Sequence, residues 1–500
     1  MSESTTTQGA PAQGTAAQGT AQQGTTNRST TPTGSAFTEQ IQQGWAERPA
    51  ALPEPRPAAA FAAERRARIA AMHPGVRLVI PAGSLKVRSN DTDYPFRPHP
   101  DFTYLTGWGS DAEPDSVLVL DPVEGEHRAT LYFRGPAGRG TTEFYANPAI
   151  GEFWVGPRPS LEHVAADLGL ATADLGELEA ALTAGGDDAA DALVVTGADP
   201  AVEAMVAGAN PDGDVLARDL SELRLVKDAH EIAEVQAAVD ATARGFDDVI
   251  ADLGEATRHE RGERVVEGAF HRRARLDGNA VGYDTIAASG HHACYLHWTR
   301  NDGRVREGDL ILLDAGVEVD SLYTADITRT LPISGRFTEL QRRVYEAVLE
   351  AADAAFAVVR PGIVFKEVHA AAMEVIARRT AEWGLLPISA EESLDPEQQL
   401  HRRWMVHGTS HHLGLDVHDC AQARRDFYHE GTVHEGMVFT IEPGLYFQAD
   451  DLTVPEELRG IGVRIEDDIL VTADGAVNLS GSIPRTADDV EAWMERVRSR

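Results

Sequence analysis

The sequence predicts an α+β protein in which a mixed α/β N-terminal domain precedes a second, C-terminal domain. In the first half of the chain, short apolar runs alternate with alanine-rich stretches of helical spacing. A long amphipathic helix is predicted to begin near Asp228, and several apolar strands after it carry polar residues that solvent exposure alone would not place there. The length of 500 residues is too great for one ordinary domain and agrees with two or three.

The chain is expected to begin with a disordered, low-complexity tail over residues 1–36. The unit AQGT at 12–15 returns at 17–20, and QQGT follows at 22–25. Before Phe37 the segment carries hardly any side chain larger than alanine that could be buried. Burial therefore cannot offset the entropy lost on ordering. We predict a solvated and dispensable tail.

The first folded domain is expected over residues 37–222. FAAERRARIAAM at 61–72 has helical spacing, and RLVIPAG at 77–83 is typical of a short strand ended by Pro-Ala-Gly. SVLVLDP at 116–122 and ATLYFRG at 129–135 predict two further strands. None of these segments has the spacing of a catalytic constellation, so we expect this domain to support the second one or to form part of a pocket.

Composition excludes several classes of partner. The chain has 45 Lys and Arg residues against 79 Asp and Glu residues, a net charge of −34, which repels phosphate backbones and anionic membranes. The two cysteines, Cys294 and Cys420, cannot form a disulfide framework. The first residues lack the basic and apolar regions of a secretory signal, and no apolar run approaches the roughly 18 residues of a membrane helix. We therefore expect a soluble, cytoplasmic protein that binds neither nucleic acid nor membranes.

Two aspartates in the second domain, expected over 223–500, lie beside apolar strands. The buried-type run 310–313 ends in Asp314, and Asp326 opens a run that alternates as a strand does. A carboxylate at the end of a buried strand is costly unless it is paired, hydrogen-bonded or bound to a metal. Each aspartate alone is more often a turn or cap residue. A hairpin-length separation of the two favours a shared cation.

A histidine-rich segment follows at 407–418, between glycines that permit close backbone approach. Imidazole is both a common metal ligand and a proton shuttle near neutral pH. A single histidine here would more often be structural, whereas four within twelve residues leave a structural role and a functional site equally open. The four are His407, His411, His412 and His418.

Two glutamates near the C-terminus complete the candidate set. Glu442 follows an apolar strand and precedes Pro443-Gly444, while Arg464 and Glu466 share one face of a later strand. A surface ion pair is the alternative for that last strand. Four carboxylates and a histidine exceed the needs of one tetrahedral zinc and suit two divalent ions about 3.5–4 Å apart. Oxygen-rich ligation favours manganese or magnesium, and the imidazole leaves zinc, cobalt and iron open.

These motifs closely resemble the pita-bread metallopeptidases, and within them aminopeptidase P. The resemblance covers Ser84 to Met494 and implies a C-terminal pita-bread (creatinase/aminopeptidase-like) catalytic domain. The N-terminal text PDFTYLTGWGSDAEPDSVLVL is similar to that family's first domain. The matching catalytic motifs are YLHWTRN around His297, LLDAG at Asp314, TADITRTLP at Asp326, HGTSHHLGLDVHD at 407–419, TIEPGLYF at Glu442 and GVRIEDD at Glu466.

The resemblance implies five ligands for two divalent ions, with manganese expected first and zinc, cobalt or iron as alternatives. By this resemblance Asp314 holds one metal, Asp326 and Glu466 bridge both, and His411 and Glu442 complete the other. The separation of Asp314 and Asp326 is one residue longer than in well-known members. We interpret this as a variation in the hairpin that leaves ligation intact.

The resemblance also implies an activity: release of the first residue from peptides with proline in the second position, by attack of a metal-bridging hydroxide. Glu442 is expected to take the proton of the nucleophile and pass it to the proline nitrogen, and His418 to stabilise the oxyanion. His297 and His407 are expected to line the site that receives proline. Tyr446 and Arg464 are expected to orient ligands.

Several alternatives stay open. Xaa-Pro dipeptidase (prolidase) shares the fold, metals and ligand order, although SHHLGLDVHD and EPGLYF favour aminopeptidase P. A methionine aminopeptidase fits the ligands but does not require the large preceding domain. Creatinase-like hydrolases, and non-catalytic peptide-binding proteins on the same scaffold, typically lack ligands that are intact here. We expect a homo-oligomer, a dimer or a tetramer, that acts on peptides with an N-terminal Xaa-Pro.

Overall fold

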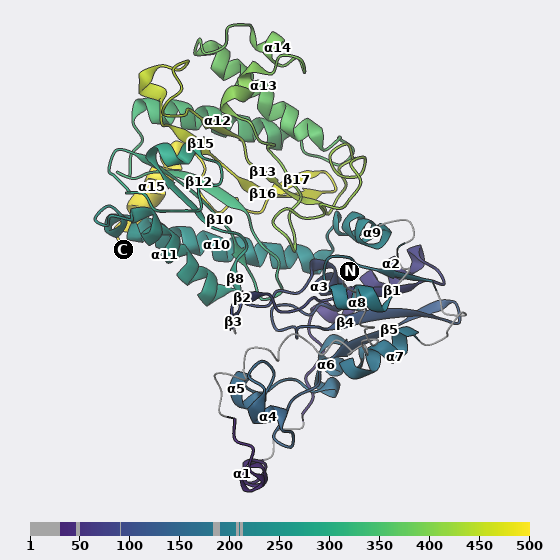
Figure 1. Ribbon diagram of the computed structural model, residues 1–500. Helices are drawn as coiled ribbons and strands as arrows, with labels where there is room; N and C mark the ends of the chain where they lie inside the picture. Colours follow the sequence, from purple (N-terminus) through teal and green to yellow (C-terminus); the bar gives the residue numbers. More distant parts are fainter. Residues whose placement is uncertain (1–30, 47–50, 91, 184–190, 207–209, 211–213) are drawn as a thin grey trace, which may run out of the picture. The chain divides into compact units, whose positions relative to one another are not determined.

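A computed structural model of the chain describes residues 31–46, 51–90, 92–183, 191–206, 210 and 214–500 (Figure 1). Residues 1–30 of the predicted tail lie outside the described residues, and Ser35 and Ala36 begin helix α1 (Ser35–Ile41). The chain forms two compact units. One contains the described residues within Met1–Ala51, Leu85–Phe96 and Gly135–Ser160, and the other those within Leu52–Ser84, Arg97–Arg134 and Leu161–Arg500.

The smaller unit is held together by aromatic side chains. Its elements are α1, the hairpin of β2 (Val87–Ser89) and β3 (Thr92–Asp93), α4 (Glu143–Ala146) and α5 (Glu152–Val155). The ring of Phe37 meets Tyr145 edge-on at 5.0 Å, and Trp45 meets Phe144 in the same way at 5.8 Å. Edge-to-face contacts of this kind add roughly 0.5–1.5 kcal/mol beyond the area that they bury.

The N-terminal part of the larger unit contains a five-stranded mixed sheet in the order β6-β5-β4-β1-β7. The strands are β1 (Arg77–Pro81), β4 (Val117–Val123), β5 (Glu126–Phe133), β6 (Ala171–Asp174) and β7 (Ala192–Val194). β1, β4 and β5 pair antiparallel, whereas β7 and β6 join the two edges in parallel. Helix α2 (Ala58–Met72) contains the predicted helix at 61–72, and β1, β4 and β5 lie at the predicted strands. The prediction of a mixed α/β region is confirmed.

The C-terminal part is built from short antiparallel sheets. One has the order β12-β10-β9, with β9 (Ile286–Ser289), β10 (Leu310–Ala315) and β12 (Ile327–Pro332). The second has the order β13-β16-β17, with β13 (Val438–Ile441), β16 (Asp467–Thr472) and β17 (Gly475–Asn478). Two further pairs join β14 (Gly444–Tyr446) to β15 (Gly462–Arg464) and β8 (Ala280–Val281) to β11 (Val317–Glu318).

Helices surround these strands (Figure 1). The bounds are α10 (Ala229–Ala256), α11 (Gly262–Asp277), α12 (Glu339–Val358), α13 (Lys366–Glu382) and α15 (Ala487–Arg498). α10 packs against α11, and α12 packs against α13. As predicted, the long helix begins after Asp228, whose side chain accepts from the backbone N–H groups of His230 and Glu231 in a capping box.

A buried ionic cluster ties the N-terminal part of this unit to the histidine-rich segment 407–418. Arg224, at the end of α9 (Val215–Arg224), donates to Asp101 at 2.8 Å and also to Asp419. Lys227 donates to the other Asp419 oxygen at 3.0 Å. Removing one partner of such a buried pair costs about 3–5 kcal/mol, because a charge is left unpaired. The predicted boundary at residue 222 falls within α9, beside this cluster, and remains a prediction.

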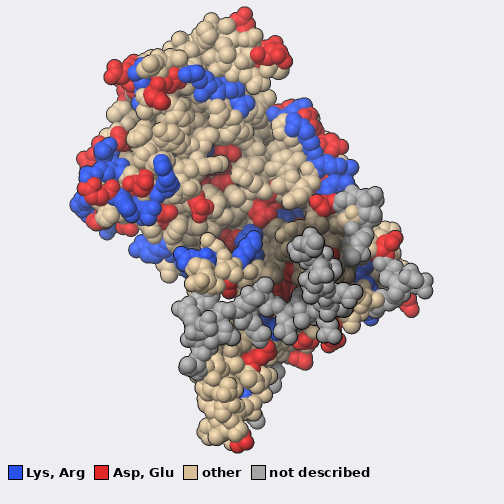
Figure 2. All heavy atoms as spheres, viewed as in Figure 1, with Lys and Arg blue, Asp and Glu red and all other residues tan. Residues whose placement is uncertain are grey.

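Charge is spread over the surface. Figure 2 shows Lys and Arg side chains interspersed with Asp and Glu on the visible face, without one continuous basic surface. Among the described residues, no helix has both the length and the apolar character that crossing a bilayer requires. The expectation that neither nucleic acid nor membranes are partners stays a prediction.

Candidate metal centre

The hairpin of β10 and β12 brings Asp314 and Asp326 together. Asp314 lies opposite Thr328 in the strand register, and Asp326 directly precedes β12. The Tyr283 hydroxyl oxygen lies 2.7 Å from Asp314 Oδ1 and 2.5 Å from Asp326 Oδ1. The Tyr283 hydroxyl therefore joins the two carboxylates.

The sheet of β13 and β16 supplies Glu442, Glu466 and His411. Glu442 directly follows β13 and Glu466 directly precedes β16, and these strands pair with Ile441 opposite Asp467. His411 lies beside β13, because the backbone N–H of Thr440 donates to its carbonyl oxygen at 2.9 Å. Strand pairing therefore places residues distant in the sequence around one point.

His411 lies at the centre of this group. Its Nε2 is 3.3 Å from Asp326 Oδ2, 3.7 Å from Glu442 Oε1 and 4.0 Å from Glu466 Oε1. One ligand atom each of Asp326, His411 and Glu466 lies within 4.8 Å of the other two. Nδ1 lies 3.2 Å from the His412 carbonyl oxygen, so it is the nitrogen that donates there. This tautomer leaves Nε2 directed at the carboxylates, as metal-binding histidines require.

In the metal-free chain, burial opposes ionisation of three carboxyl groups of the site. Burial, followed by the charges of neighbouring carboxylates, raises the pKa of Glu466 well above its ordinary value. Burial also raises the pKa of Asp314, and that of Glu442 to about 7. Burial disfavours the protonated form of His411, yet the hydrogen bond to Asp326 and the nearby carboxylates raise its pKa to about 9.

The donor set fits divalent cations. Three buried carboxylates and the partly buried Glu442 lie near the guanidinium of Arg464, which donates to Asp314 and lies 3.1 Å from Thr328 Oγ1. Carboxylates in such a place need counter-charge, which protons supply in the metal-free chain and metal ions supply otherwise. Oxygen ligands with one imidazole suit manganese, iron, cobalt or zinc. The four are Asp314, Asp326, Glu442 and Glu466.

A hydrogen-bonded chain runs from Arg464 to His407. Arg464 Nη1 donates to the Tyr446 hydroxyl oxygen at 3.2 Å, and that hydroxyl lies 2.8 Å from His407 Nε2. His407 Nδ1 lies 2.6 Å from the Gly408 carbonyl oxygen and donates there, so Nε2 accepts from Tyr446. Burial, with the charge of Arg464, lowers the pKa of His407 to about 3 and keeps it neutral. His407 Nδ1 also lies 3.5 Å from Glu442 Oε2.

His418 and His297 lie on the solvent side of the site. The His418 ring meets the His411 ring edge-on at 4.5 Å. Burial of its ring lowers the pKa of His418, and the charges of His411 and His297 act in the same direction. His297 is exposed in the loop that follows the 3₁₀ helix Gly290–Cys294. The chain thus gathers all five predicted ligands, with His418, His407, Tyr446 and Arg464 close by.

Sequence reasoning missed Tyr283 and left the histidine cluster open between a structural and a functional role. Tyr283 precedes β9 without any periodic pattern that would single it out. His412 belonged to this cluster without an assigned role; its ring is buried and stacks on Phe365 at 4.6 Å, with Tyr428 edge-on at 4.7 Å. His412 contributes its backbone carbonyl to His411, and its ring belongs to the core.

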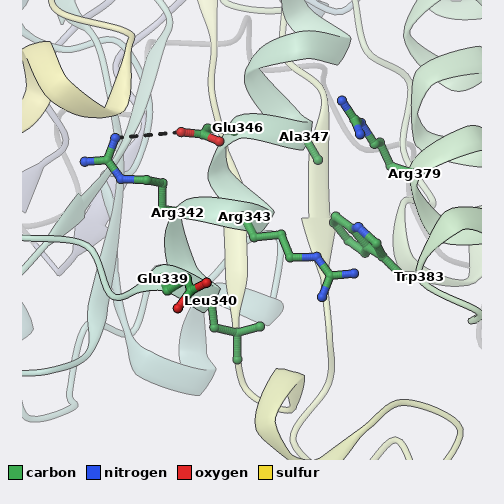
Figure 3. Close-up of a pocket in the computed structure, with 8 residues that line it drawn as sticks. All are labelled: Glu339, Leu340, Arg342, Arg343, Glu346, Ala347, Arg379 and Trp383. Carbon is green, nitrogen blue, oxygen red and sulfur yellow. Dashed lines mark ion pairs between the residues drawn. The ribbon is translucent and has the colours of Figure 1, made fainter.

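A cavity of about 570 Å³ lies elsewhere, between α12 and α13 (Figure 3). Figure 3 shows Arg343 beside Trp383, with the guanidinium carbon 4.8 Å from the ring centroid. Arg342 is paired with Asp488 at 2.7 Å, and Arg379 with Glu382 at 3.0 Å. None of the candidate ligands lines this cavity, so the functional assignment does not depend on it.

Two family models match the chain. "Aminopeptidase P, N-terminal domain" matches residues 61–192, and "Metallopeptidase family M24" matches residues 233–473. Xaa-Pro aminopeptidase 1 of Streptomyces coelicolor is 51% identical over 470 residues, 92% of each chain. Xaa-Pro aminopeptidase of Escherichia coli is 34% identical over 456 residues, 88% of this chain and 98% of that protein.

Solved structures agree with this. The structure of Pseudomonas aeruginosa aminopeptidase PepP is similar with a TM-score of 0.77 and 30% identity, and the match covers 90% of this chain and all of that one. A variant of Escherichia coli aminopeptidase P in complex with substrate gives a TM-score of 0.75 and 32% identity, with 88% of this chain and 98% of that chain covered.

Metal affinity is predicted to rise with pH. Because Asp314, Glu442, Glu466 and His411 all have raised pKa values in the metal-free chain, a divalent cation must displace protons. The dissociation constant for Mn²⁺ should fall as the pH rises from about 6 to about 8, with release of protons. Titration calorimetry in buffers of different ionisation enthalpy measures both quantities, and a pH-independent affinity without proton release would contradict the assignment.

Asp326→Ala and Glu466→Ala are each predicted to lower metal content and to abolish activity. Each removes a carboxylate whose oxygen lies within the ligand group around His411 Nε2. Elemental analysis of the purified variants gives metal per chain, and peptide hydrolysis gives turnover. A variant that kept wild-type metal content and near-normal turnover would show that its carboxylate is not a ligand.

Proposed function

Because the chain belongs to the Xaa-Pro aminopeptidase family of M24 metallopeptidases, we propose that it releases the N-terminal residue from peptides with proline in the second position. It is a metal-dependent peptide hydrolase. The observation that carries the proposal is the convergence of carboxylates on His411 Nε2, in a chain that is 51% identical to an Xaa-Pro aminopeptidase over most of its length.

Two divalent ions per chain, manganese first, are the proposed cofactor. Asp314 would hold one ion, His411 and Glu442 the other, and Asp326 and Glu466 both. Support comes from the surplus of buried carboxylates over cationic side chains and from the Tyr283 hydroxyl, which touches both Asp314 and Asp326. When bound, such ions lower the pKa of water and so supply the nucleophile near neutral pH.

Glu442 is the proposed general base and then general acid. Its carboxylate lies between His411 and His407, and burial raises its pKa to about 7 in the metal-free chain. A carboxylate within reach of the nucleophile can accept its proton and later return it. We assign Glu442 the proton of the nucleophile, which it hands to the proline nitrogen as the peptide bond breaks.

The remaining histidines are proposed to hold the substrate. His418 is exposed beside His411, where it can donate to the carbonyl oxygen as negative charge develops. His297 and His407 line the place for proline. The Tyr446 hydroxyl donates to His407 and so fixes the orientation of its neutral ring. Arg464 donates to both Tyr446 and Asp314. A shift of Arg464 would therefore move the proposed proline pocket and the candidate ligands at the same time.

A cytoplasmic location and a homo-oligomer of two or four chains complete the proposal. Both cysteines are buried free thiols, as a reducing compartment allows. On α5, the consecutive residues Phe153, Trp154 and Val155 are 60%, 57% and 51% exposed, an apolar surface that association would cover. Light scattering of the purified chain tests the mass, and fractionation of cells tests the location.

The two peptidase assignments differ in substrate length. An aminopeptidase is predicted to cleave Xaa-Pro-Yaa tripeptides with a much larger kcat/KM than Xaa-Pro dipeptides, and a prolidase to do the reverse. Peptides of matched sequence, with Xaa-Ala-Yaa as the control for proline, decide between them. Preference for the dipeptide would reassign the chain to Xaa-Pro dipeptidase, and metal-loaded chain without turnover of any peptide would favour a binding protein.

Glu442→Gln is predicted to separate chemistry from binding. Glutamine keeps the shape and one oxygen ligand but loses the basic carboxylate. General acid–base catalysis contributes about 10²- to 10⁴-fold, so kcat should fall by at least that factor while KM changes much less. Metal content is the control. A variant with full metal content and nearly wild-type kcat would show that another group, with His418 the first candidate, moves the proton.

A further inference from the structure

One buried carboxylate outside the candidate metal centre forms hydrogen bonds with several residues of the loop that carries His297. Glu263 lies in the first turn of α11, fully buried. Its Oε1 accepts from the backbone N–H of Ser289 at 2.8 Å and contacts His292 Nδ1 at 2.7 Å. Its Oε2 accepts from Trp298 Nε1 at 2.9 Å and from the backbone N–H of Gly303 at 2.7 Å.

These four contacts span the loop. Ser289 ends β9 and Gly303 lies where the chain returns toward β10, so the carboxylate joins the two ends of the loop, while His292 and Trp298 lie inside it. The carboxyl group makes these four hydrogen bonds from the N-terminal turn of α11. The packing is tight as well, because a Cβ atom at Gly303 would lie 2.6 Å from the His292 ring and 2.8 Å from the Glu263 carboxyl carbon.

The restraint reaches His297 through its neighbour Trp298. The indole stacks on the His292 ring with centroids 3.8 Å apart and planes 25° apart, and the guanidinium carbon of Arg300 lies 4.2 Å from the indole ring centroid. The backbone N–H of Thr299 donates to the His297 carbonyl oxygen at 3.0 Å, which closes a turn over Trp298. The His297 side chain is thus exposed, while Glu263 restrains the backbone beside it through Trp298.

We propose that Glu263 is a positioning residue for His297 and thereby sets the recognition of proline. The inference rests on the proposed role of His297 in receiving the substrate. Glu263 lies in α11 and contacts none of the candidate ligands; it binds the loop, and through Ser289 at the end of β9 it also adjoins the sheet that carries Asp314. A displacement of about 1 Å in a substrate-contacting group can cost about 10²-fold in rate, so a fixed loop matters more here than the exposure of His297 suggests.

Glu263→Gln tests this, because its amide group must face two of the four donors. We expect kcat/KM for an Xaa-Pro-Yaa peptide to fall by about 10- to 100-fold with metal content unchanged. The decisive measurement is a double-mutant cycle with His297→Ala: if Glu263 acts through His297, Glu263→Gln causes no further loss in the His297→Ala background.

Two other variants make the outcomes distinct. Trp298→Phe removes one donor while it keeps an aromatic ring in the stack, and should give a smaller loss of kcat/KM that also vanishes in the His297→Ala background. Glu231→Gln is the matched control, since Glu231 is a buried carboxylate in the first turn of α10, bound to Tyr323. It should lower the melting temperature without changing kcat/KM.

The results separate failure of the inference from failure of the function on which it rests. Wild-type kcat/KM in His297→Ala would remove the proposed role of His297. Impaired His297→Ala together with wild-type kcat/KM in Trp298→Phe and Glu263→Gln would overturn the role of Glu263 alone. If Glu263→Gln or Trp298→Phe lowers kcat/KM by the same factor in the wild-type and His297→Ala backgrounds, the inference is also overturned and Glu263 has a general structural role. If Glu263→Gln does not fold, Trp298→Phe carries the cycle.

Discussion

The architecture of the C-terminal part depends on one electrostatic constraint, a group of buried carboxylates with too little positive charge around it. Asp314, Asp326, Glu442 and Glu466 face the guanidinium of Arg464 and the imidazole of His411. Burying each unpaired charge costs several kcal/mol, so the chain can hold this group only with bound protons or bound cations. The uncompensated carboxylates lower the stability of the metal-free fold, and the same lack of counter-charge favours binding of divalent cations.

The surrounding structure has to hold the carboxylates in place against their mutual repulsion. Antiparallel pairing does so, since β10 with β12 and β13 with β16 fix the register of the residues at their ends. The hydroxyl groups of Tyr283 and Thr328 and the chain from Arg464 to His407 then fix the side chains. Behind the site, the Arg224–Asp419–Lys227 cluster anchors the far end of the segment that carries His411 and His418.

Features that depend on neighbouring residues in the sequence can be predicted from the sequence alone. Asp314 and Glu442 are visible because each ends an apolar strand, and the helix after Asp228 is visible through its period and its cap. Tyr283, Glu263 and Arg224 have no such signal, because their roles arise from partners up to 195 residues away. For His412 the sequence left a structural and a functional role equally open, and packing among aromatic rings, which the sequence does not show, makes its ring part of the core.

Carboxylates of the same type in this chain differ in how their charge is balanced. Burial opposes ionisation of Asp419, yet Arg224 and Lys227 hold its pKa well below the ordinary value. Four hydrogen-bond donors surround Glu263. Hydrogen bonds and ion pairs within the chain balance these charges without a ligand. At Glu466 burial raises the pKa and the charges of neighbouring carboxylates raise it further, and at Glu442 burial raises the pKa against the opposing charges of His411 and Arg464. Neighbouring side chains alone therefore do not balance these two charges. Local charge balance therefore distinguishes these structural carboxylates from the candidate metal ligands, where burial alone does not.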